Sequence, residues 1–314
     1  MQNHPTVAAP EWTIAKLIKW TTSYFQTQSI DSPRTDAEIL LAHVLNLNRI
    51  DLYLRYDQPL SQNELAQFKT LIKRRINREP VAYIVGVKEF WSMDLAVTKD
   101  VLIPRPETEC LVETALSLLP EDTGSEPTFT SMRVLELGTG SGAIVIALAA
   151  QRREHRFFAS DRSSKAVEMA VENAKRHGLD QKIKFFCGDW LNPMNNSRHG
   201  FDMILSNPPY IRSREVDRLQ PEIFMYEPLM ALDGGGDGLD CLRCIIESAH
   251  TFLKAYGSLL LEIDHDQRAA VKKIIDSCQS YENITFKKDY SGYDRIVRMQ
   301  KKHHDQNSGS LFQL

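Results

Sequence analysis

The stretch of this sequence with the clearest chemical potential is a polar turn that follows the apolar run of residues 201–205. It consists of Ser206, Asn207, Pro208, Pro209 and Tyr210. The apolar run predicts a buried strand, and the prolines end it because neither can donate to a sheet ladder and both fix φ. Ligands bind at the carboxyl ends of strands in open α/β sheets. The turn therefore presents an amide, rigid carbonyls and an aromatic ring where a ligand would bind.

Such a turn suits the methylation of a planar NH2 group, whose nitrogen is a poor nucleophile because its lone pair is delocalised. We expect the Asn207 side-chain oxygen and the Pro208 backbone carbonyl each to accept one N–H, which holds the nitrogen in line with an electrophile. Tyr210 would pack flat against the substrate group, beside a turn stiffened by Pro209. A plain surface turn is the alternative, because Asn-Pro is common turn chemistry.

A second motif predicts a nucleotide-cofactor site. The apolar strand of residues 134–137 carries one acid, Glu136, and runs into a glycine-rich turn that precedes the apolar residues 143–149. The turn consists of Gly138, Thr139, Gly140, Ser141 and Gly142. Glycines at the start of a helix let the backbone approach a ligand closely. Asp161 ends the next apolar strand, where a carboxylate can accept both ribose hydroxyls.

The glycine turn does not by itself distinguish S-adenosylmethionine from NAD, because Gly138, Gly140 and Ala143 also satisfy the relaxed dinucleotide fingerprint. The turn of residues 207–210 does discriminate. S-adenosylmethionine carries a methyl electrophile and NAD does not, and a site that holds an amide has no use in hydride transfer. We therefore expect S-adenosyl-L-methionine as the cofactor.

The predicted strand of residues 182–187 ends at Gly188, Asp189 and Trp190. An acid and an indole at this position can meet an adenine ring through a hydrogen bond and a stacking face. A core tryptophan is the alternative reading of Trp190.

Further motifs narrow the assignment. In chain order they are residues 79–84 (EPVAYI), 89–91 (EFW), 102–109 (LIPRPETE), 227–228 (EP) and 236–240 (GDGLD). Together with the glycine turn, Asp161 and residues 207–210, this series resembles the HemK/PrmC family of peptide chain release factor glutamine methyltransferases over residues 34–298. The resemblance implies an α/β fold of class I S-adenosylmethionine-dependent methyltransferases, with a seven-stranded Rossmann-like sheet and an N-terminal helical bundle domain.

The resemblance also implies a reaction. It is methyl transfer from S-adenosylmethionine to the glutamine side-chain amide in the Gly-Gly-Gln motif of release factors, which gives N(5)-methylglutamine. Asn207, Pro208 and Tyr210 would then be catalytic, and Asn207 would also lie against the cofactor. Trp190 would face the adenine. Arg105 and Glu107 would shape the pocket, although structural salt bridges explain them equally well.

The surrounding elements divide the chain into four predicted parts. They are a helical substrate-docking domain (residues 1–84, of which the first ten are disordered), a β-hairpin linker (85–100), a catalytic methyltransferase domain (101–300) and a disordered tail (301–314). A structural cap is the alternative role for the first part. Apolar spacing predicts its helices over residues 11–25, from Ser32-Pro33 onward, over 48–56 and over 61–77, the last with a capping box of Ser61 and Glu64.

The predicted catalytic domain alternates strands and helices, as a doubly wound parallel sheet requires. Residues 124–130 form a flexible lead, and residues 211–230 form a mobile cover over the pocket. Helices are expected over residues 163–177, 239–256 and 265–278, a strand over 258–263, and a final hairpin from residues 284–286 and 295–297. In the N-terminal part, one helix carries a basic face that is either solvated or contacts an acidic protein. Its residues are Lys69, Lys73, Arg74, Arg75 and Arg78.

Composition limits the remaining classes of function. At 314 residues and a formal net charge of −3, the chain has room for two domains and is poorly suited to wrapping a nucleic-acid backbone. Its best apolar run is too short to cross a membrane. The 5 cysteines are scattered, which fits a reducing cytoplasm. Cys241 and Cys244 have metal-like spacing but no second pair, so we expect no metal.

Three positions depart from the family pattern. Arg78 stands where a small residue is usual, Asp264 replaces a glycine, and Ala255-Tyr256 replaces Pro-Gly. None of these positions lies in the glycine turn or in residues 207–210. We expect them to affect docking and strand-end geometry rather than the reaction.

Three alternative functions remain open at this stage. A ribosomal-protein glutamine methyltransferase shares the catalytic turn, but its loop resembles Pro-Arg-Ser-Pro rather than the sequence of residues 104–107. An adenine N(6) DNA methyltransferase shares the Asn-Pro-Pro-Tyr turn, because adenine also offers a planar NH2, yet it should carry a target-recognition region and a basic face. The third is a cofactor-binding factor that holds a release factor without turnover.

Overall fold

The computed structural model describes residues 12–121, 130–194 and 200–303. The predicted disorder of residues 1–10, most of the flexible lead and nearly all of the tail lie outside these ranges. The chain forms two compact units. The helical unit comprises the residues up to Gly86 together with Gln220–Tyr226, and the α/β unit comprises Val87–Leu219 and the residues from Glu227 onward.

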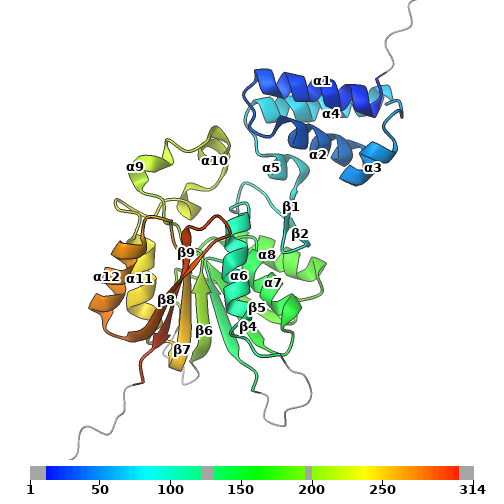
Figure 1. Cartoon of the computed structure of the whole chain (residues 1–314). Helices are drawn as coiled ribbons and strands as arrows, with labels where there is room; N and C mark the ends of the chain where they lie inside the picture. Colours follow the sequence, from blue (N-terminus) through cyan, green and yellow to red (C-terminus); the bar gives the residue numbers. More distant parts are fainter. Residues whose placement is uncertain (1–11, 122–129, 195–199, 304–314) are drawn as a thin grey trace, which may run out of the picture. The chain divides into compact units, whose positions relative to one another are not determined.

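The helical unit is built from short helices around one apolar core (Figure 1). They are α1 (Ile14–Thr27), α2 (Pro33–Leu45), α3 (Arg49–Leu54), α4 (Gln62–Ile76) and α5 (Val81–Val85). The unit also includes α10 (Pro221–Tyr226), which has no buried residue. The predicted capping box is confirmed: Ser61 Oγ accepts from Glu64 N at 3.3 Å, and Glu64 Oε2 accepts from Ser61 N at 2.6 Å. Two backbone donors at the start of α4 are thereby satisfied.

The predicted basic face of α4 is largely neutralised within the helical unit. Arg75 is only 6% exposed, and its guanidinium lies 2.7 Å from Asp36 Oδ2 and 2.9 Å from Glu222 Oε1. Arg78 also pairs with Glu222, at 3.3 Å, and Arg74 pairs with Glu79. The expectation of a solvated or partner-binding side chain is therefore wrong for Arg75, which is buried against acids of the same unit. Arg74 and Arg78 are partly exposed and also pair with acids of this unit.

The α/β unit contains the predicted hairpin and a seven-stranded sheet. In the hairpin, β1 (Val87–Phe90) pairs antiparallel with β2 (Met93–Ala96). The strands of the sheet are β3 (Arg133–Leu137), β4 (Arg156–Asp161), β5 (Ile183–Cys187), β6 (Phe201–Ser206), β7 (Leu253–Glu262), β8 (Tyr281–Lys288) and β9 (Asp294–Lys301). Their order is β5-β4-β3-β6-β7-β9-β8, parallel from β5 to β7 and antiparallel at β9 and β8.

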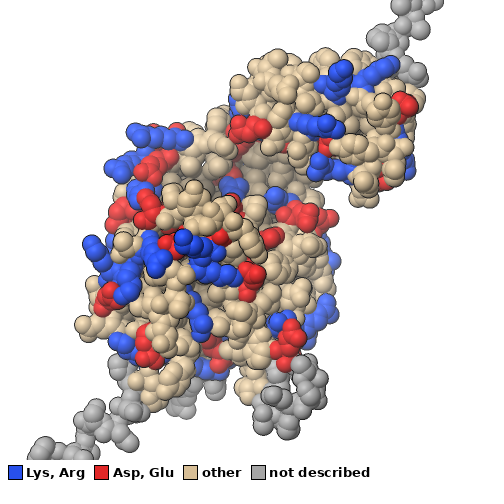
Figure 2. Space-filling view, in the orientation of Figure 1, with Lys and Arg blue, Asp and Glu red and all other residues tan. Residues whose placement is uncertain are grey.

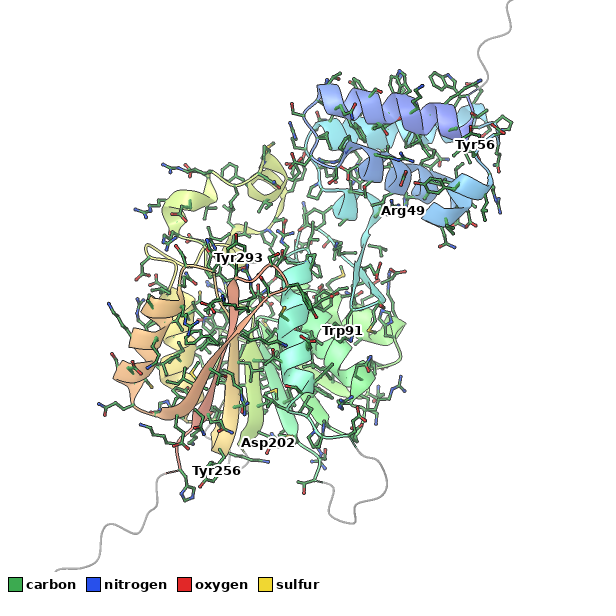
Figure 3. The ribbon with its side chains drawn as sticks, in the orientation of Figure 1. Arg49, Tyr56, Trp91, Asp202, Tyr256 and Tyr293 are labelled. Atoms are coloured by element: carbon green, nitrogen blue, oxygen red, sulfur yellow. The ribbon has the colours of Figure 1, made fainter. Side chains whose placement is uncertain are left out.

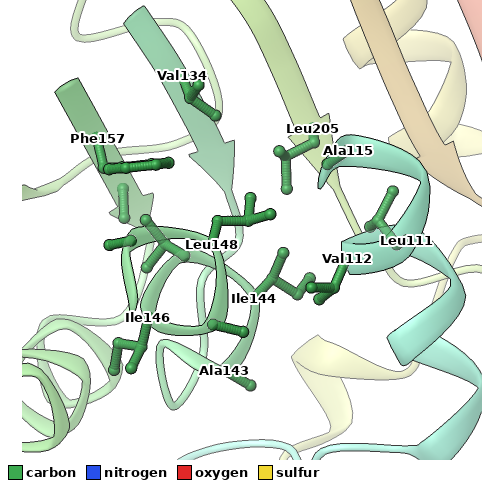
Figure 4. Close-up of a cluster of buried hydrophobic side chains, with 14 of the residues drawn as sticks. Leu111, Val112, Ala115, Val134, Ala143, Ile144, Ile146, Leu148, Phe157 and Leu205 are labelled. Carbon is green, nitrogen blue, oxygen red and sulfur yellow. The ribbon is translucent and has the colours of Figure 1, made fainter. Parts of the chain in front are cut away.

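Helices cover both faces of this sheet, as the doubly wound prediction requires. They are α6 (Glu109–Leu116), α7 (Ala143–Gln151), α8 (Ser164–Arg176), α11 (Asp240–Ala249) and α12 (Arg268–Cys278). Three short helices lie in the connections: η1 (Pro106–Thr108), α9 (Ser213–Val216) and η2 (Leu229–Ala231). Alternate strand side chains point to opposite faces. Val134 and Leu205 therefore pack with α6 and α7 (Figure 4), whereas Leu135 and Ile204 pack with α11 and α12.

Two predicted helix boundaries are wrong. The helix expected over residues 239–256 ends at Ala249, and β7 begins at Leu253 rather than at residue 258. A register shift in the β6–β7 pairing brings these extra residues into the strand, and Leu253 is buried in the core. The helix expected from residue 265 begins at Arg268. Residues 211–230 contain α9, α10 and the start of η2, and the mobility of this segment stays a prediction.

Two departures from the family pattern occupy left-handed backbone conformations. Arg78 has φ 70° and Tyr256 has φ 61°, where small residues and glycine are favoured. Arg78 makes up for this with its side chain, because its guanidinium donates to the carbonyls of Ser29 and Gln28 at 3.0 and 2.9 Å. An arginine at this position thus ties two segments of the helical unit together.

The glycine turn yields a test of packing between α7 and α8. Gly142 and Gly140 both have positive φ, +83° and +55°, but a Cβ at Gly142 would lie 2.9 Å from Ile146 Cδ1 and 3.1 Å from Ala170 Cβ, whereas a Cβ at Gly140 would meet nothing within 4 Å. We expect Gly140→Ala to lower the free energy of unfolding by about 1 kcal/mol through backbone strain. Gly142→Ala should cost about 2–3 kcal/mol, because overpacking adds to that strain. Urea denaturation measures both, and equal losses would contradict the packing constraint.

Candidate active site

The parallel register of the central strands brings the two predicted motifs to one edge of the sheet. Leu137 of β3 is opposite Ser206 of β6 and also opposite Ser160 of β4. The Ser206 hydroxyl donates to the Leu137 carbonyl at 2.7 Å, which pins the strand ends together. The glycine turn, Asp161 and Asn207 therefore leave neighbouring strands side by side.

These strand ends line a cavity of about 330 Å³. The predicted site residues on its wall are Gly138, Gly140, Asp161, Asp189, Trp190, Asn207 and Pro209. Thr139, Ser141, Gly142, Pro208 and Tyr210 do not contribute to this wall. The cavity is also lined by residues that the sequence did not point to, including Val101 and Ala231.

Trp190 and the glycine turn form adjoining walls of this cavity. Trp190 is half-buried, and a Cβ added to Gly138 would lie 3.6 Å from the indole ring. Gly138 itself has φ +70°, a conformation that glycine adopts without penalty. Trp190 is thus part of the cavity wall and not a fully buried core tryptophan.

Asp161 braces the glycine turn. Its Oδ2 accepts from Gly140 N at 2.9 Å, and its Oδ1 accepts from Ser163 N at 2.8 Å. Burial raises the pKa of this carboxyl, whereas the backbone donors lower it. Each carboxylate oxygen can accept more than one hydrogen bond, so both oxygens still have acceptor capacity toward the cavity.

A second acid, Glu136, supports the turn from within the sheet and explains why Thr139 is buried. Glu136 Oε2 accepts from the Thr139 hydroxyl at 2.7 Å and from Val145 N at 3.1 Å. The side chain is 1% exposed, and burial raises its pKa to about 8. The sequence showed one acid in an apolar strand, and the structure identifies it as an internal anchor for the glycine turn.

Hydrogen bonds hold two side chains of the Asn-Pro-Pro-Tyr turn in place. Asn207 lies on the cavity wall and donates through Nδ2 to Thr108 Oγ1 at 3.0 Å. Tyr210 instead points its hydroxyl to Glu262 Oε1 at 3.2 Å, and burial raises its pKa. This hydrogen bond anchors the ring from behind the turn, and the packing of the ring against the substrate stays a prediction.

Side chains from distant parts of the chain hold this turn and the loop before η1 in place by hydrogen bonds. Gln267 Nε2 donates to the carbonyls of Tyr210 and Gly238, each at 3.0 Å. The buried Glu227 accepts from Arg105 Nη2 at 2.6 Å and from Ile103 N at 3.2 Å. Arg105 is thus held in a salt bridge, which was one of its two predicted roles. Gln267 was missed because it sits in a polar run that precedes a helix and offers no motif.

The charge around the cavity is mainly negative. Asp100, Asp161, Asp189 and Asp233 line it, with Arg162 as a basic neighbour. Such a lining favours a ligand that carries positive charge. On the face of the α/β unit drawn in Figure 2, basic side chains lie beside acidic ones. Figure 3 places Tyr293 near the edge where β6 ends, and Asp202 at the opposite edge where it begins.

Other candidate sites give no support for metal chemistry or membrane insertion. Cys241 and Cys244 lie on α11, and burial raises the pKa of both thiols. In the ranges that the structure covers, no group of three or more His, Cys, Asp or Glu side chains is arranged to bind a metal ion. Among the helices of those ranges, none has both the length and the apolar character to cross a membrane.

The sheet order, the glycine turn at the end of β3 and the acid at the end of β4 define a class I S-adenosylmethionine-dependent methyltransferase. Residues 129–308 match the family described as "Methyltransferase domain". The hMettl16 catalytic domain has the same fold, with a TM-score of 0.52 at 16% identity over 80% of this chain and 86% of that one. S-adenosylmethionine is the methyl donor of this class, and its net positive charge fits the acidic lining of the cavity.

The particular family follows from the rest of the chain. Residues 16–86 match the "PrmC N-terminal domain". The chain is 39% identical over 286 residues to the release factor glutamine methyltransferase of Geobacter sulfurreducens, covering 91% of this chain and 96% of that protein. It is 38% identical over 276 residues to that of Agrobacterium fabrum, covering 88% and 93%. The chain belongs to the release factor glutamine methyltransferase family.

The raised pKa of Glu136 predicts a pH-dependent stability. A folded-state pKa of about 8 lies above the usual glutamate value, so the folded state binds more protons than the unfolded state between about pH 4.5 and 8. The free energy of unfolding should therefore fall as pH rises through this window, by about 1 kcal/mol per pH unit relative to Glu136→Gln. The glutamine oxygen can keep both hydrogen bonds, which now share Oε2.

Urea denaturation at several pH values between 5 and 8 measures this difference. Glu168→Gln is the matched control, because Glu168 is exposed on α8 and should keep the wild-type slope. Parallel pH profiles for wild type and Glu136→Gln would contradict the assignment.

Proposed function

We propose that this enzyme transfers the methyl group of S-adenosylmethionine to the side-chain amide nitrogen of the glutamine in the Gly-Gly-Gln motif of peptide chain release factors. The names of its relatives support the substrate. The observation that carries the chemistry is the position of Asn207. Its amide lies on the cavity wall with Nδ2 donating to Thr108, and among the described residues Oδ1 accepts no hydrogen bond.

In this proposal the chain works mainly by positioning. S-adenosylmethionine supplies a methyl carbon bound to a sulfonium sulfur. Asn207 Oδ1 and the Pro208 carbonyl accept the two N–H groups of the substrate amide, which orients its nitrogen and favours the positive charge that develops on it. Pro209 keeps the turn rigid, and Tyr210 supports it from behind. No strong base is required, and none lies in the turn.

We assign the cofactor contacts to the cavity wall. Asp161 would accept hydrogen bonds from the ribose hydroxyls, as an acid at the end of this strand does in nucleotide-binding α/β folds. Asp189 and Trp190 would contact the adenine. Gly138 and Gly140 would let the backbone approach the ligand. In this assignment Thr139, Ser141 and Gly142 shape the turn and give it its helix start, and they act on the cofactor through the backbone.

We also propose that residues 1–84 dock the protein substrate, with residues 85–100 as the linker hairpin, residues 101–300 as the catalytic domain and the tail from residue 301 outside it. The helical unit exposes apolar side chains on and beside α3, and such patches often mark protein-binding surfaces. They are Ile50, Tyr53, Leu54 and Tyr56, of which Tyr56 is labelled in Figure 3. The proposal places the enzyme in the cytoplasm without a stable nucleic-acid partner.

Transfer of labelled methyl from S-adenosylmethionine tests this function. The substrates are purified release factor, the same factor with its Gly-Gly-Gln glutamine replaced, a ribosomal protein fraction and duplex DNA. Label on the intact factor alone is the expected result. Label on DNA or on the ribosomal proteins would instead favour an adenine or a ribosomal-protein methyltransferase, and cofactor binding without any label would favour a non-catalytic factor.

Two substitutions should separate chemistry from cofactor binding. Asn207→Ala is expected to keep cofactor affinity and to lower kcat by about 100-fold or more, because it removes an interaction with the reacting amide. Asp161→Ala should first weaken cofactor affinity, measured by calorimetry. Asn283→Ala, on the exposed side of β8, is the control and should leave both quantities unchanged. Equal loss of affinity and turnover in Asn207→Ala would count against an amide-binding role.

A further inference from the structure

Four side chains behind the cavity form one buried polar group. Asn207 Nδ2 donates to Thr108 Oγ1 at 3.0 Å, and the Tyr210 hydroxyl donates to Glu262 Oε1 at 3.2 Å. The Thr108 side chain also lies beside the Glu262 carboxyl and lowers its pKa. Thr108 is 4% exposed and Glu262 is 0% exposed. The catalytic turn therefore meets one deeply buried acid directly through Tyr210, and Asn207 faces that acid across the Thr108 hydroxyl.

The direction of these hydrogen bonds depends on the charge of the acid. A threonine hydroxyl has one proton to donate, and an ionised carboxylate can only accept. With Glu262 ionised, the negative charge beside Thr108 favours the hydroxyl orientation in which the proton faces the carboxylate. The Thr108 oxygen then accepts from Asn207 Nδ2, as it does at 3.0 Å. The Asn207 carboxamide is then fixed with Nδ2 turned inward and Oδ1 toward the cavity.

Protonation of Glu262 would remove this constraint on the orientation of the Asn207 carboxamide. A carboxylic acid can donate to the Thr108 oxygen, which frees the Thr108 proton to point at Asn207. An asparagine amide has an acceptor at one end and donors at the other, so it could then turn over and present its NH2 to the cavity. That orientation opposes the N–H groups of an amide substrate instead of accepting them.

The groups around Glu262 have opposing effects on the pKa of its carboxyl. Its Oε2 is buried with no hydrogen-bond partner in the described part of the chain. Burial raises its pKa to about 7, the neighbouring charge of Glu107 adds to this, and Thr108, Tyr210 and the Arg295 guanidinium lower it. Arg295 is itself shared with Asp289, at 3.2 Å. These groups come from η1, the catalytic turn and β9, the elements packed around the end of β7.

We propose that Thr108 and Glu262 are positioning residues that fix the Asn207 carboxamide with Oδ1 facing the substrate amide. The inference rests on the proposed function, because it concerns how the same turn recognises an N–H donor. Neither residue needs to touch the substrate. Thr108 lies in the 102–109 motif, and Glu262 ends a strand that carries no motif, so their joint role follows from the contact between them.

Steady-state kinetics with release factor tests the role of Thr108. Thr108→Val keeps the shape and removes the hydroxyl, so we expect kcat to fall by about 10- to 100-fold, with the affinity for S-adenosylmethionine changed by less than about 2-fold. Thr108→Ser restores the hydroxyl and should recover most of the lost turnover. Thr114→Val is the matched control, because the Thr114 hydroxyl donates only to the Cys110 carbonyl, and its kinetics should match wild type.

The pH profile of kcat tests the role of Glu262. Wild-type kcat should rise through an apparent pKa near 7 as Glu262 ionises. Glu262→Gln imitates the protonated acid, so its kcat should be low and should lack this rising limb. Thermal unfolding and cofactor affinity are recorded for each variant, and release factor affinity is measured with S-adenosylhomocysteine bound, which reports on amide recognition without turnover.

The outcomes separate this inference from the proposed function. If wild-type enzyme does not methylate release factor, the proposed function fails. If wild type is active, a Thr108→Val enzyme with wild-type kcat, or a Glu262→Gln enzyme that keeps the wild-type rising limb, overturns the inference alone. If Thr108→Val loses cofactor affinity and stability in proportion to kcat while Thr108→Ser does not recover turnover, the residue is structural and the inference is also wrong.

Discussion

The parallel register of β3, β4 and β6 is the constraint on which the site depends. Because Leu137 is paired with both Ser160 and Ser206, the three strands end at the same edge of the sheet. A slip of one residue in a strand would turn its side chains to the opposite face. The Ser206 hydroxyl on the Leu137 carbonyl resists such a slip where it would matter most. The position of the cavity thus follows from the pairing of the strands.

Buried acids then fix the loops at that edge. Glu136 accepts a hydrogen bond from the glycine turn, and Asp161 accepts one from the backbone of Gly140. Glu227 accepts one from the backbone of the loop before η1, and Glu262 accepts one from the Tyr210 hydroxyl. Each carboxyl accepts hydrogen bonds from a segment that has no regular partner of its own. Burying a carboxyl is costly unless it is hydrogen-bonded, and the raised pKa values of all four groups reflect that cost.

Local features of the sequence predicted those parts of the fold that depend on local patterns. Short apolar runs predicted the strands of the parallel sheet, the capping box at Ser61 predicted the start of α4, and the Asn-Pro-Pro-Tyr turn predicted which strand end faces the cavity. The errors arose where distant residues decide. Residues 253–256 have no strand signature, yet the pairing of Leu253 with Phe201 of β6 makes them part of β7. The charge of Arg75 looked free because its partner Glu222 lies far along the chain.

The same distinction separates the residues of the site that carry motifs from those that orient them. Asn207 was identifiable because a strand end followed by two prolines is unusual. Thr108 and Glu262 were not, because an isolated threonine and a strand-end glutamate are common, and only the fold brings residues 108, 207 and 262 together. If Oδ1 of Asn207 is to accept from the substrate, Nδ2 must point away from the substrate. A carboxamide by itself does not favour either of these two orientations. The orientation of Asn207 must therefore be imposed from behind, by groups that never meet the substrate and that a short motif cannot contain.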